Sequence, residues 1–347
     1  MVAYALGNRE NEEHEIDILN EGSPDSINFS KSITISLFDY FSNKEKFVVP
    51  YSTIRKVKNA RLKGAREVVY TATGRPDRFP HIKSLLELWG FSSYIEYLYT
   101  VAELGFLEGL IPVLDVGFLT PEEMKSISEI AALLKIPYES LVDYQLIEAG
   151  ILKAEQQSQF RLKNLEWAGK LQIPTITSVL IGSGLTKTKR KAQFDFIQKL
   201  HDKYGTIHEV SLDTFSLPKA IKGTKGSIPN KKEILESIEH AKSILSDDIV
   251  LSINIDKNSK YIVDCIKKGV TDLGTIAIDY EKKNIDQFTF EQLDNEITNA
   301  GYVLHQRFPL TKKFIKEERY SKKLGQVFDA YRYKIKKEHQ ERIKESK

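Results

Sequence analysis

The sequence predicts an α/β protein, a (β/α)8 barrel of the TIM type with a basic helical extension at its C-terminus. Short apolar segments rich in β-branched residues alternate with amphipathic helical patterns between residues 33 and 300. Such segments are typical of parallel strands that are buried on both faces. The chain of 347 residues is also long enough for one barrel of ordinary size. A doubly wound open sheet is the competing architecture.

The expected strands follow one another at fairly regular intervals. They are Ile33–Leu37, Glu67–Thr71, Leu110–Leu114, Ser140–Tyr144, Thr175–Ile181, Glu209–Phe215, Ile249–Ile255 and Leu273–Ile278. Among the helices between them, Thr120–Leu134 has the clearest start, because it opens Thr-Pro-Glu-Glu. This tetrapeptide offers a capping hydroxyl, a proline for the first turn and two acids that suit the positive helix end. Lys191–Tyr204 and Lys231–Leu245 have similar amphipathic spacing.

The two ends of the chain differ in charge from the segment between them. We expect an acidic N-terminal segment (1–30), a barrel (31–310) and a basic C-terminal helix and tail (311–347). The first half of the C-terminal helix should pack on the barrel, near Arg307-Phe308-Pro309, and the last residues should stay solvated. The apolar positions that favour this packing are Phe314, Leu324, Val327, Phe328, Tyr331 and Ile335.

Composition argues against several classes of protein. A formal net charge of +3 gives no strong positive field, so nucleic acid is not an expected partner. No apolar run approaches the roughly 18 residues that span a bilayer, and the N-terminus lacks the segments of a signal peptide. One cysteine, Cys265, excludes an internal disulfide framework. We therefore expect a cytoplasmic protein without membrane contacts.

Acidic side chains recur at or just past the predicted strand ends. In a barrel these ends meet at the mouth, where active sites lie. Carboxylates held close together could bind a hard cation or share a proton, although aspartate also commonly caps the following helix. We predict no metal site from this pattern. The candidate catalytic residues are Asp115, Asp143, Asp213, Asp256 and Lys257.

The segment Arg161–Phe215 joins a helix, a strand, a glycine turn, a second helix and a second strand. It resembles the radical S-adenosylmethionine subunit of deazaflavin (FO) synthase, the CofG type. The resemblance extends from roughly Ile33 to Lys323 and implies the same barrel. In that family three cysteines, spaced CxxxCxxC, hold an iron–sulfur cluster. Three further segments are similar to the family in the same order: Pro80–Val101, Leu110–Glu123 and Gly301–Ile315.

The departures from this family fall at its functional positions. Cys265 lies far from the loop after the first strand, where CxxxCxxC belongs. The family's Gly-Glu after the second strand, which holds the methionine amino group, is here Thr73-Gly74-Arg75. We therefore predict no iron–sulfur cluster, and the groups that would hold S-adenosylmethionine are incomplete. A glycine turn at a helix start can still cradle a phosphate, or it can be only a tight turn. The candidate cofactor-binding residues are Thr73, Gly74, Gly182, Ser183 and Gly184.

Three functions stay open at this point. The leading hypothesis is a cluster-less homologue of the synthase subunit, acting as a non-radical binding protein in deazaflavin biosynthesis. Its expected partners are an intact deazaflavin synthase subunit and a small molecule at the barrel mouth. The second hypothesis is an enzyme of another class, with the mouth refitted for acid–base or metal-assisted chemistry. The third and weaker one is a synthase subunit proper.

Overall fold

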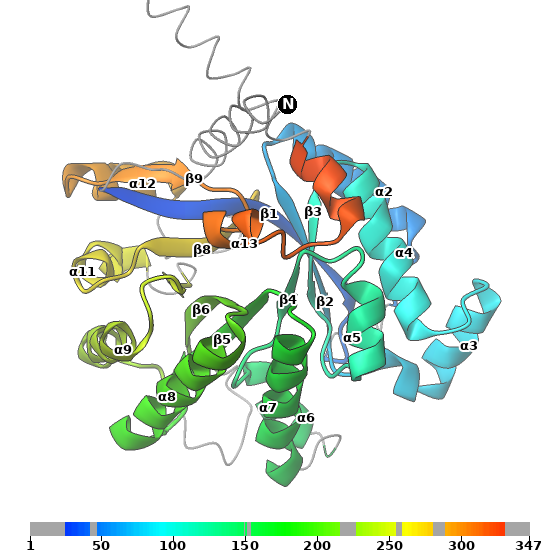
Figure 1. Ribbon diagram of the computed structural model, residues 1–347, viewed down its shortest axis with the longest axis horizontal. Helices are drawn as coiled ribbons and strands as arrows, with labels where there is room; N and C mark the ends of the chain where they lie inside the picture. Colours follow the sequence, from blue (N-terminus) through cyan, green and yellow to red (C-terminus); the bar gives the residue numbers. More distant parts are fainter. Residues whose placement is uncertain are drawn as a thin grey trace, which may run out of the picture.

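The computed structural model describes residues 25–41, 47–148, 150, 154–215, 227–254, 259–279 and 289–329. Its core is a closed barrel of eight parallel strands surrounded by helices (Figure 1), which confirms the predicted (β/α)8 fold. The strands run in the order β2-β3-β4-β5-β6-β7-β8-β1, and β1 also pairs with β2 and so closes the barrel. A short ninth strand pairs with the first residues of β1.

The strands are β1 (Ser26–Phe38), β2 (Glu67–Ala72), β3 (Ile111–Asp115), β4 (Leu133–Lys135), β5 (Thr175–Ile181), β6 (Ile207–Thr214), β7 (Val250–Ile253), β8 (Asp272–Ala277) and β9 (Val303–Gln306). The helices are α2 (Tyr51–Leu62), α3 (Pro80–Leu88), α4 (Tyr94–Leu107), α5 (Pro121–Ile127), α6 (Leu141–Glu148), α7 (Ala154–Lys170), α8 (Lys187–Tyr204), α9 (Lys231–Ile244), α11 (Ile262–Lys267), α12 (Phe290–Asn299) and α13 (Lys312–Lys316), with short 3-10 turns at Pro76–Arg78 and Ser259–Tyr261. Within the described ranges no helix has the length and apolar content needed to cross a membrane.

The fourth predicted strand, Ser140–Tyr144, is wrong. The fourth strand of the barrel is β4, which lies inside the region predicted as the helix Thr120–Leu134. α5 keeps the predicted start, where Thr120 and Glu123 form a capping box, but it ends at Ile127. The apolar run that follows suits a buried strand as well as a buried helix, so periodicity alone could not decide between them.

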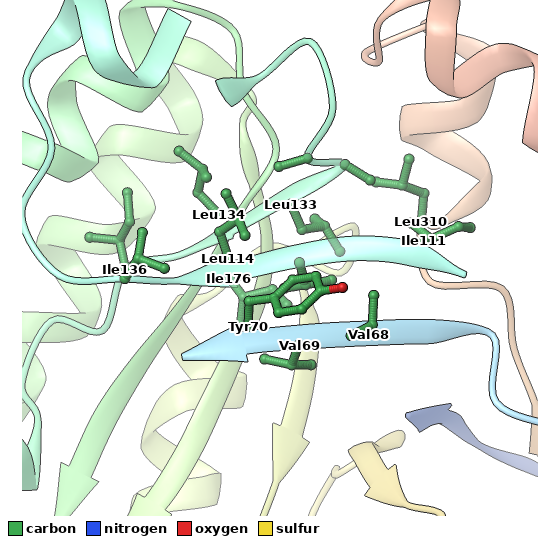
Figure 2. Close-up of a cluster of buried hydrophobic side chains, with 14 of the residues drawn as sticks. Val68, Val69, Tyr70, Ile111, Leu114, Leu133, Leu134, Ile136, Ile176 and Leu310 are labelled. Atoms are coloured by element: carbon green, nitrogen blue, oxygen red, sulfur yellow. The ribbon is translucent and has the colours of Figure 1, made fainter. Parts of the chain in front are cut away.

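Successive side chains along β1 alternate between a buried apolar environment and the solvent-accessible interior of the barrel. In β1, Ile35 and Leu37 are buried, whereas the intervening Thr34 and Ser36 are exposed. Thr34 and Ser36 lie on the same strand face as Ser32, whose register partner is Glu67 of the barrel interior. Solvent therefore reaches the interior of the barrel along β1. Figure 2 shows part of the apolar cluster, with side chains from β2 to β5.

The N-terminal end of the barrel is closed by the chain that leaves β9. Arg307 donates hydrogen bonds to Asp272 of β8 and Glu209 of β6, so this segment crosses the base of the barrel. Phe308 and Leu310 follow and are fully buried. The base is therefore filled with side chains and carries its own ionic network.

The C-terminal extension packs on the barrel as predicted, but not as one continuous helix. α13 ends at Lys316, Glu318 adopts a left-handed conformation (φ 49°), and a second helical stretch covers 322–329. Phe314 and Phe328 are buried, and the Phe328 ring lies 5.1 Å from that of Phe308. The expected solvated tail and residues 1–24 of the predicted acidic segment 1–30 lie outside the described residues. Residues 26–30 of that segment are part of β1, so the barrel begins earlier than predicted.

Candidate functional site

Three charged side chains occupy the mouth end of the barrel strands. β3 ends with Asp115, β4 ends with Lys135, and Asp213 is the penultimate residue of β6. The register of β3 with β4 places Asp115 and Lys135 at neighbouring positions. The charges of Asp115 and Asp213 both act on Lys135. The structure thus brings together two of the predicted aspartates and a lysine, and we refer to these three residues as the mouth triad.

The mouth triad is electrostatically coupled. Burial raises the pKa of Asp115, and the nearby positive charges of Lys135 and Arg161 only partly oppose this effect. Burial alone would lower the pKa of Lys135, but the carboxylates around it, led by Asp213 and Asp115, outweigh burial and raise it. Lys135 therefore stays protonated at neutral pH and is a cation rather than a nucleophilic amine.

None of these charges is neutralised by direct contact. Asp115 and Lys135 make no hydrogen bond or ion pair with any described part of the chain, and Asp213 accepts a hydrogen bond from the Ser211 hydroxyl (3.0 Å). Buried charges in proteins usually have such partners. The mouth triad therefore retains hydrogen-bonding capacity that a bound molecule could use.

Asp143 lies near the mouth triad but not at a strand end, because the strand predicted there is helix α6. Its carboxylate is buried and accepts two hydrogen bonds from Arg161 of α7, one of them 2.6 Å from Nη2 to Oδ1. A bidentate pair of this kind leaves Asp143 little capacity for a ligand. The other two candidates, Asp256 and Lys257, lie outside the described residues and stay predictions.

The Gly182-Ser183-Gly184 turn is closely packed within the protein. A Cβ on Gly182 (φ 91°) would lie 2.4 Å from the carbonyl oxygen of Ser227. The Ser183 hydroxyl is buried and donates to Glu139 (3.3 Å). Thr186 already caps α8 through the amide of Lys189. These contacts favour a tight strand-to-helix turn over a phosphate cradle.

The loop after β2 is held in place by Arg75. Its guanidinium binds Asp77 and Glu123 in a bidentate manner, with distances between 2.6 and 3.0 Å. Gly74 (φ 63°) touches the next loop, since a Cβ on Gly117 would lie 2.4 Å from the Gly74 carbonyl oxygen. Arg75 therefore connects the loop after β2 to the loop after β3, and Thr73 and Gly74 lie directly before Arg75 in the first of these loops.

The residues that follow β1 do not fit an iron–sulfur cluster. Cluster iron is held by thiolates, and the link between β1 and α2, residues 39–50, contains neither cysteine nor histidine. Cys265 lies on α11 with no exposed surface, and burial raises its pKa to about 12. Its thiol is therefore buried and protonated. In the described part of the chain no three His, Cys, Asp or Glu side chains are grouped as metal ligands.

Lys135, Glu139 and Arg161 were not among the sequence-predicted site residues. Lys135 was missed because it directly follows the region predicted as a helix, and the sequence pattern did not mark it as the end of a strand. Glu139 is buried in the β4–α6 link, and the hydrogen bonds that Ser183 and Gln193 donate to it are set by tertiary packing. A helix boundary at Ile127 would have been the signal that revealed Lys135.

Comparison with curated proteins gives a consistent result. The chain is 27% identical over 318 residues to the 7,8-didemethyl-8-hydroxy-5-deazariboflavin synthase of Archaeoglobus fulgidus, covering 88% of this chain and 96% of that protein. It is 29% identical to the synthase of Methanococcus aeolicus, covering 84% of this chain and 86% of that protein. This chain is a divergent homologue of the deazaflavin synthases.

Solved structures agree on the fold of this synthase homologue. The FeFe-hydrogenase maturase HydG of Carboxydothermus hydrogenoformans matches with a TM-score of 0.63 and 11% identity, over 84% of this chain and 70% of the maturase. A second HydG structure matches with a TM-score of 0.64 and 13% identity, over 93% and 71% of the two chains. At this identity the likeness concerns the fold alone. No family model matches the chain.

Proposed function

We propose that this chain is a binding protein of deazaflavin biosynthesis that keeps the synthase barrel but does not use an iron–sulfur cluster. The observation that carries the proposal is the donor set: the link 39–50 has no thiol, and Cys265 is buried on α11. One cysteine cannot replace three thiolates, because cluster iron needs several soft sulfur ligands.

The mouth triad supports a role in binding a small molecule. Its charges are coupled but make no mutual contact, and solvent reaches the barrel interior at Thr34 and Ser36. The relatives are named for 7,8-didemethyl-8-hydroxy-5-deazariboflavin, so this compound is the first ligand to test. A partner role with an intact synthase subunit belongs to the same proposal.

The cluster part of the proposal is tested by anaerobic reconstitution with iron and sulfide. We expect iron and sulfide per chain to stay at background after desalting, while a cysteine-bearing deazaflavin synthase treated in parallel gains both. Stoichiometric iron and sulfide in this chain would overturn the proposal. Cys265→Ala is the matched control, and it should give the same background because the buried thiol is not a ligand.

The binding part is tested with the deazaflavin itself. Fluorescence anisotropy of 7,8-didemethyl-8-hydroxy-5-deazariboflavin should rise on addition of the protein, and the rise should weaken in Asp115→Asn. Co-elution with a cysteine-bearing synthase on a sizing column tests the partner role separately. Absence of both signals would leave the binding function without support.

A second candidate function, an enzyme of another class, is favoured by the electrostatic coupling of Asp115 with Lys135. A carboxylate whose pKa is raised by burial is a stronger base, and a fixed cation nearby can stabilise negative charge that develops on a substrate. This candidate predicts that Asp115→Asn abolishes any turnover found with the unmodified protein. Turnover that survives in Asp115→Asn would contradict it.

A further inference from the structure

The interior of the barrel carries more negative than positive side chains. Lys135 is coupled to four of the acids, and Arg307 is bonded to the fifth and to one of those four. Among the described residues, the acids are Glu67, Asp115, Glu209, Asp213 and Asp272, against the two cations Lys135 and Arg307.

The excess negative charge is concentrated at the mouth. Arg307 is fully engaged with Asp272 and Glu209 at the base. Lys135 and Arg161 both act on Asp115, and Lys135 touches neither Asp115 nor Asp213. Arg161 is engaged with Asp143, so Lys135 is left to balance Asp115 and Asp213, and one negative charge stays uncompensated when both are ionised.

A buried hydroxyl provides an independent sign that a polar molecule fits here. Ser178 of β5 has no exposed surface, and its Oγ has no hydrogen-bond partner in the described part of the protein. Ser178 is the register partner of Ser211, whose hydroxyl binds Asp213, so both serines share the strand face below Asp213. Buried hydroxyls are seldom left without a partner, because the lost hydrogen bond costs free energy.

We propose that the barrel mouth binds a small hydroxylated organic amine in its cationic form, with Asp115 and Asp213 as its main anchors. An ammonium group has three donors and no acceptor, which matches two carboxylates and the Ser178 hydroxyl. Hydroxyl groups of the ligand would meet Thr34 and Ser36, which are exposed on the interior face of β1. A carboxylate or phosphate ligand would instead be repelled by the surplus of acids.

This inference concerns the same mouth site as the proposed function, but it assigns the site an amine rather than the deazaflavin tested there, and it does not depend on the absence of a cluster. A failure to bind amines would leave the iron and sulfide result untouched, and the reverse also holds. The two ideas can therefore fail separately.

Three probes of nearly the same size test the proposal: 2-amino-1,3-propanediol, glycerol and glycerate, which are cationic, neutral and anionic at neutral pH. Their binding is followed by saturation-transfer NMR with the full chain. We expect the amine to bind roughly tenfold more tightly than glycerol, as a charge-assisted hydrogen bond implies, and glycerate to show no saturation transfer. Glycerate binding as tight as that of the amine would overturn the proposal.

Variants of the mouth triad give opposite expected signs. Asp115→Asn and Asp213→Asn keep the side-chain shape and should each weaken amine binding by roughly tenfold. Lys135→Met removes the competing cation and should strengthen amine binding by a factor of about five to ten. Lys58→Met, an exposed lysine on α2, is the matched control and should change nothing. Weaker amine binding in Lys135→Met would contradict the assignment, whatever the aspartate variants do.

Discussion

Two layers of charge lie inside this barrel, and they differ in how their charges are satisfied. At the base, Arg307 binds Asp272 at 2.5 Å and Glu209 at 2.9 Å, and Glu209 also accepts from Ser252 at 2.6 Å. At the mouth, Lys135 lies among acids but contacts none of them. The charged groups at the base are hydrogen-bonded to one another, whereas those at the mouth keep hydrogen-bonding capacity that a ligand could use.

The difference separates structural charge from charge that is available for function. A stable barrel requires that its base be filled with side chains. A buried ion pair whose hydrogen bonds are all satisfied favours one arrangement of the chain. The barrel mouth is the end where ligands bind in this architecture. Thr73-Gly74-Arg75, where the resemblance to the synthases is expected to break, also lies at the mouth, while Arg307-Phe308-Pro309 lies at the base.

The largest expected difference between base and mouth is in the stability lost when the cation of each layer is replaced by methionine. Arg307→Met leaves Asp272 and Glu209 buried without a counter-charge, so we expect it to lower the free energy of unfolding by about 3–5 kcal/mol. Lys135→Met breaks no direct contact, and a neighbouring carboxylate can take up a proton, so about 1 kcal/mol is expected. Urea denaturation at neutral pH measures both. Equal costs would show that base and mouth are not different in kind.

The second prediction concerns how the stability of the protein depends on pH through Glu67, a residue at the base of the barrel. Burial raises the pKa of Glu67 to about 7, although Arg307 and the Thr275 hydroxyl (2.9 Å) act against it. The folded state therefore holds this proton more tightly than the unfolded state does. Its contribution to stability is present below the unfolded value of 4.5 and is lost as pH rises through about 7.

Glu67→Gln should remove this pH dependence, because the amide does not titrate. Relative to the unmodified protein, we expect the variant to gain roughly 2–3 kcal/mol of unfolding free energy between acidic and mildly basic pH. Urea denaturation on both sides of neutrality measures it, with Glu87→Gln on the exposed face of α3 as the control. If the two variants follow the same pH curve, the burial of Glu67 has no energetic consequence.

The third prediction asks whether the glycine turn at the mouth is packed or open. Gly182 and Gly64 have similar positive φ angles, 91° and 85°, but a Cβ meets Ser227 oxygen only at Gly182. Gly64→Ala should cost about 1–2 kcal/mol for the left-handed backbone alone. Gly182→Ala should cost about 1–3 kcal/mol more, because the added methyl is overpacked. Thermal unfolding compares them, and equal losses would favour an open cradle at Gly182.

Sequence reasoning predicted the barrel because most of its strands are continuous apolar runs with clear boundaries. Thr175–Ile181 is a strand at the predicted residues, and Asp115 and Asp213 lie together because strand ends meet at the mouth. Reasoning failed at β4, only three residues long, because its apolar run also fits a helix. The correct placement of both Asp143 and Lys135 depends on recognising that the helix beginning after Thr120 ends at Ile127.

Other parts of the site could not be predicted from local pattern at all. Arg307 meets Glu209 across 98 residues of sequence, and only the path of the chain across the base brings them together. Arg75 and Glu123 are likewise joined by the contact of two loops. Spacing along the chain says nothing about such pairs, since tertiary packing creates them.

The smallest expected effect provides the sharpest comparison, because it uses the same substitution in both layers. Asp272→Asn removes the charge that Arg307 binds at the base and should cost about 2–3 kcal/mol of unfolding free energy. Asp213→Asn at the mouth keeps an oxygen that accepts the Ser211 hydrogen bond and removes only the through-space attraction to Lys135, so no more than about 1 kcal/mol is expected. Urea denaturation of the two variants measures the difference. A costly Asp213→Asn would mean that Asp213 is part of the folded framework, and the mouth would then have one carboxylate fewer to offer a ligand.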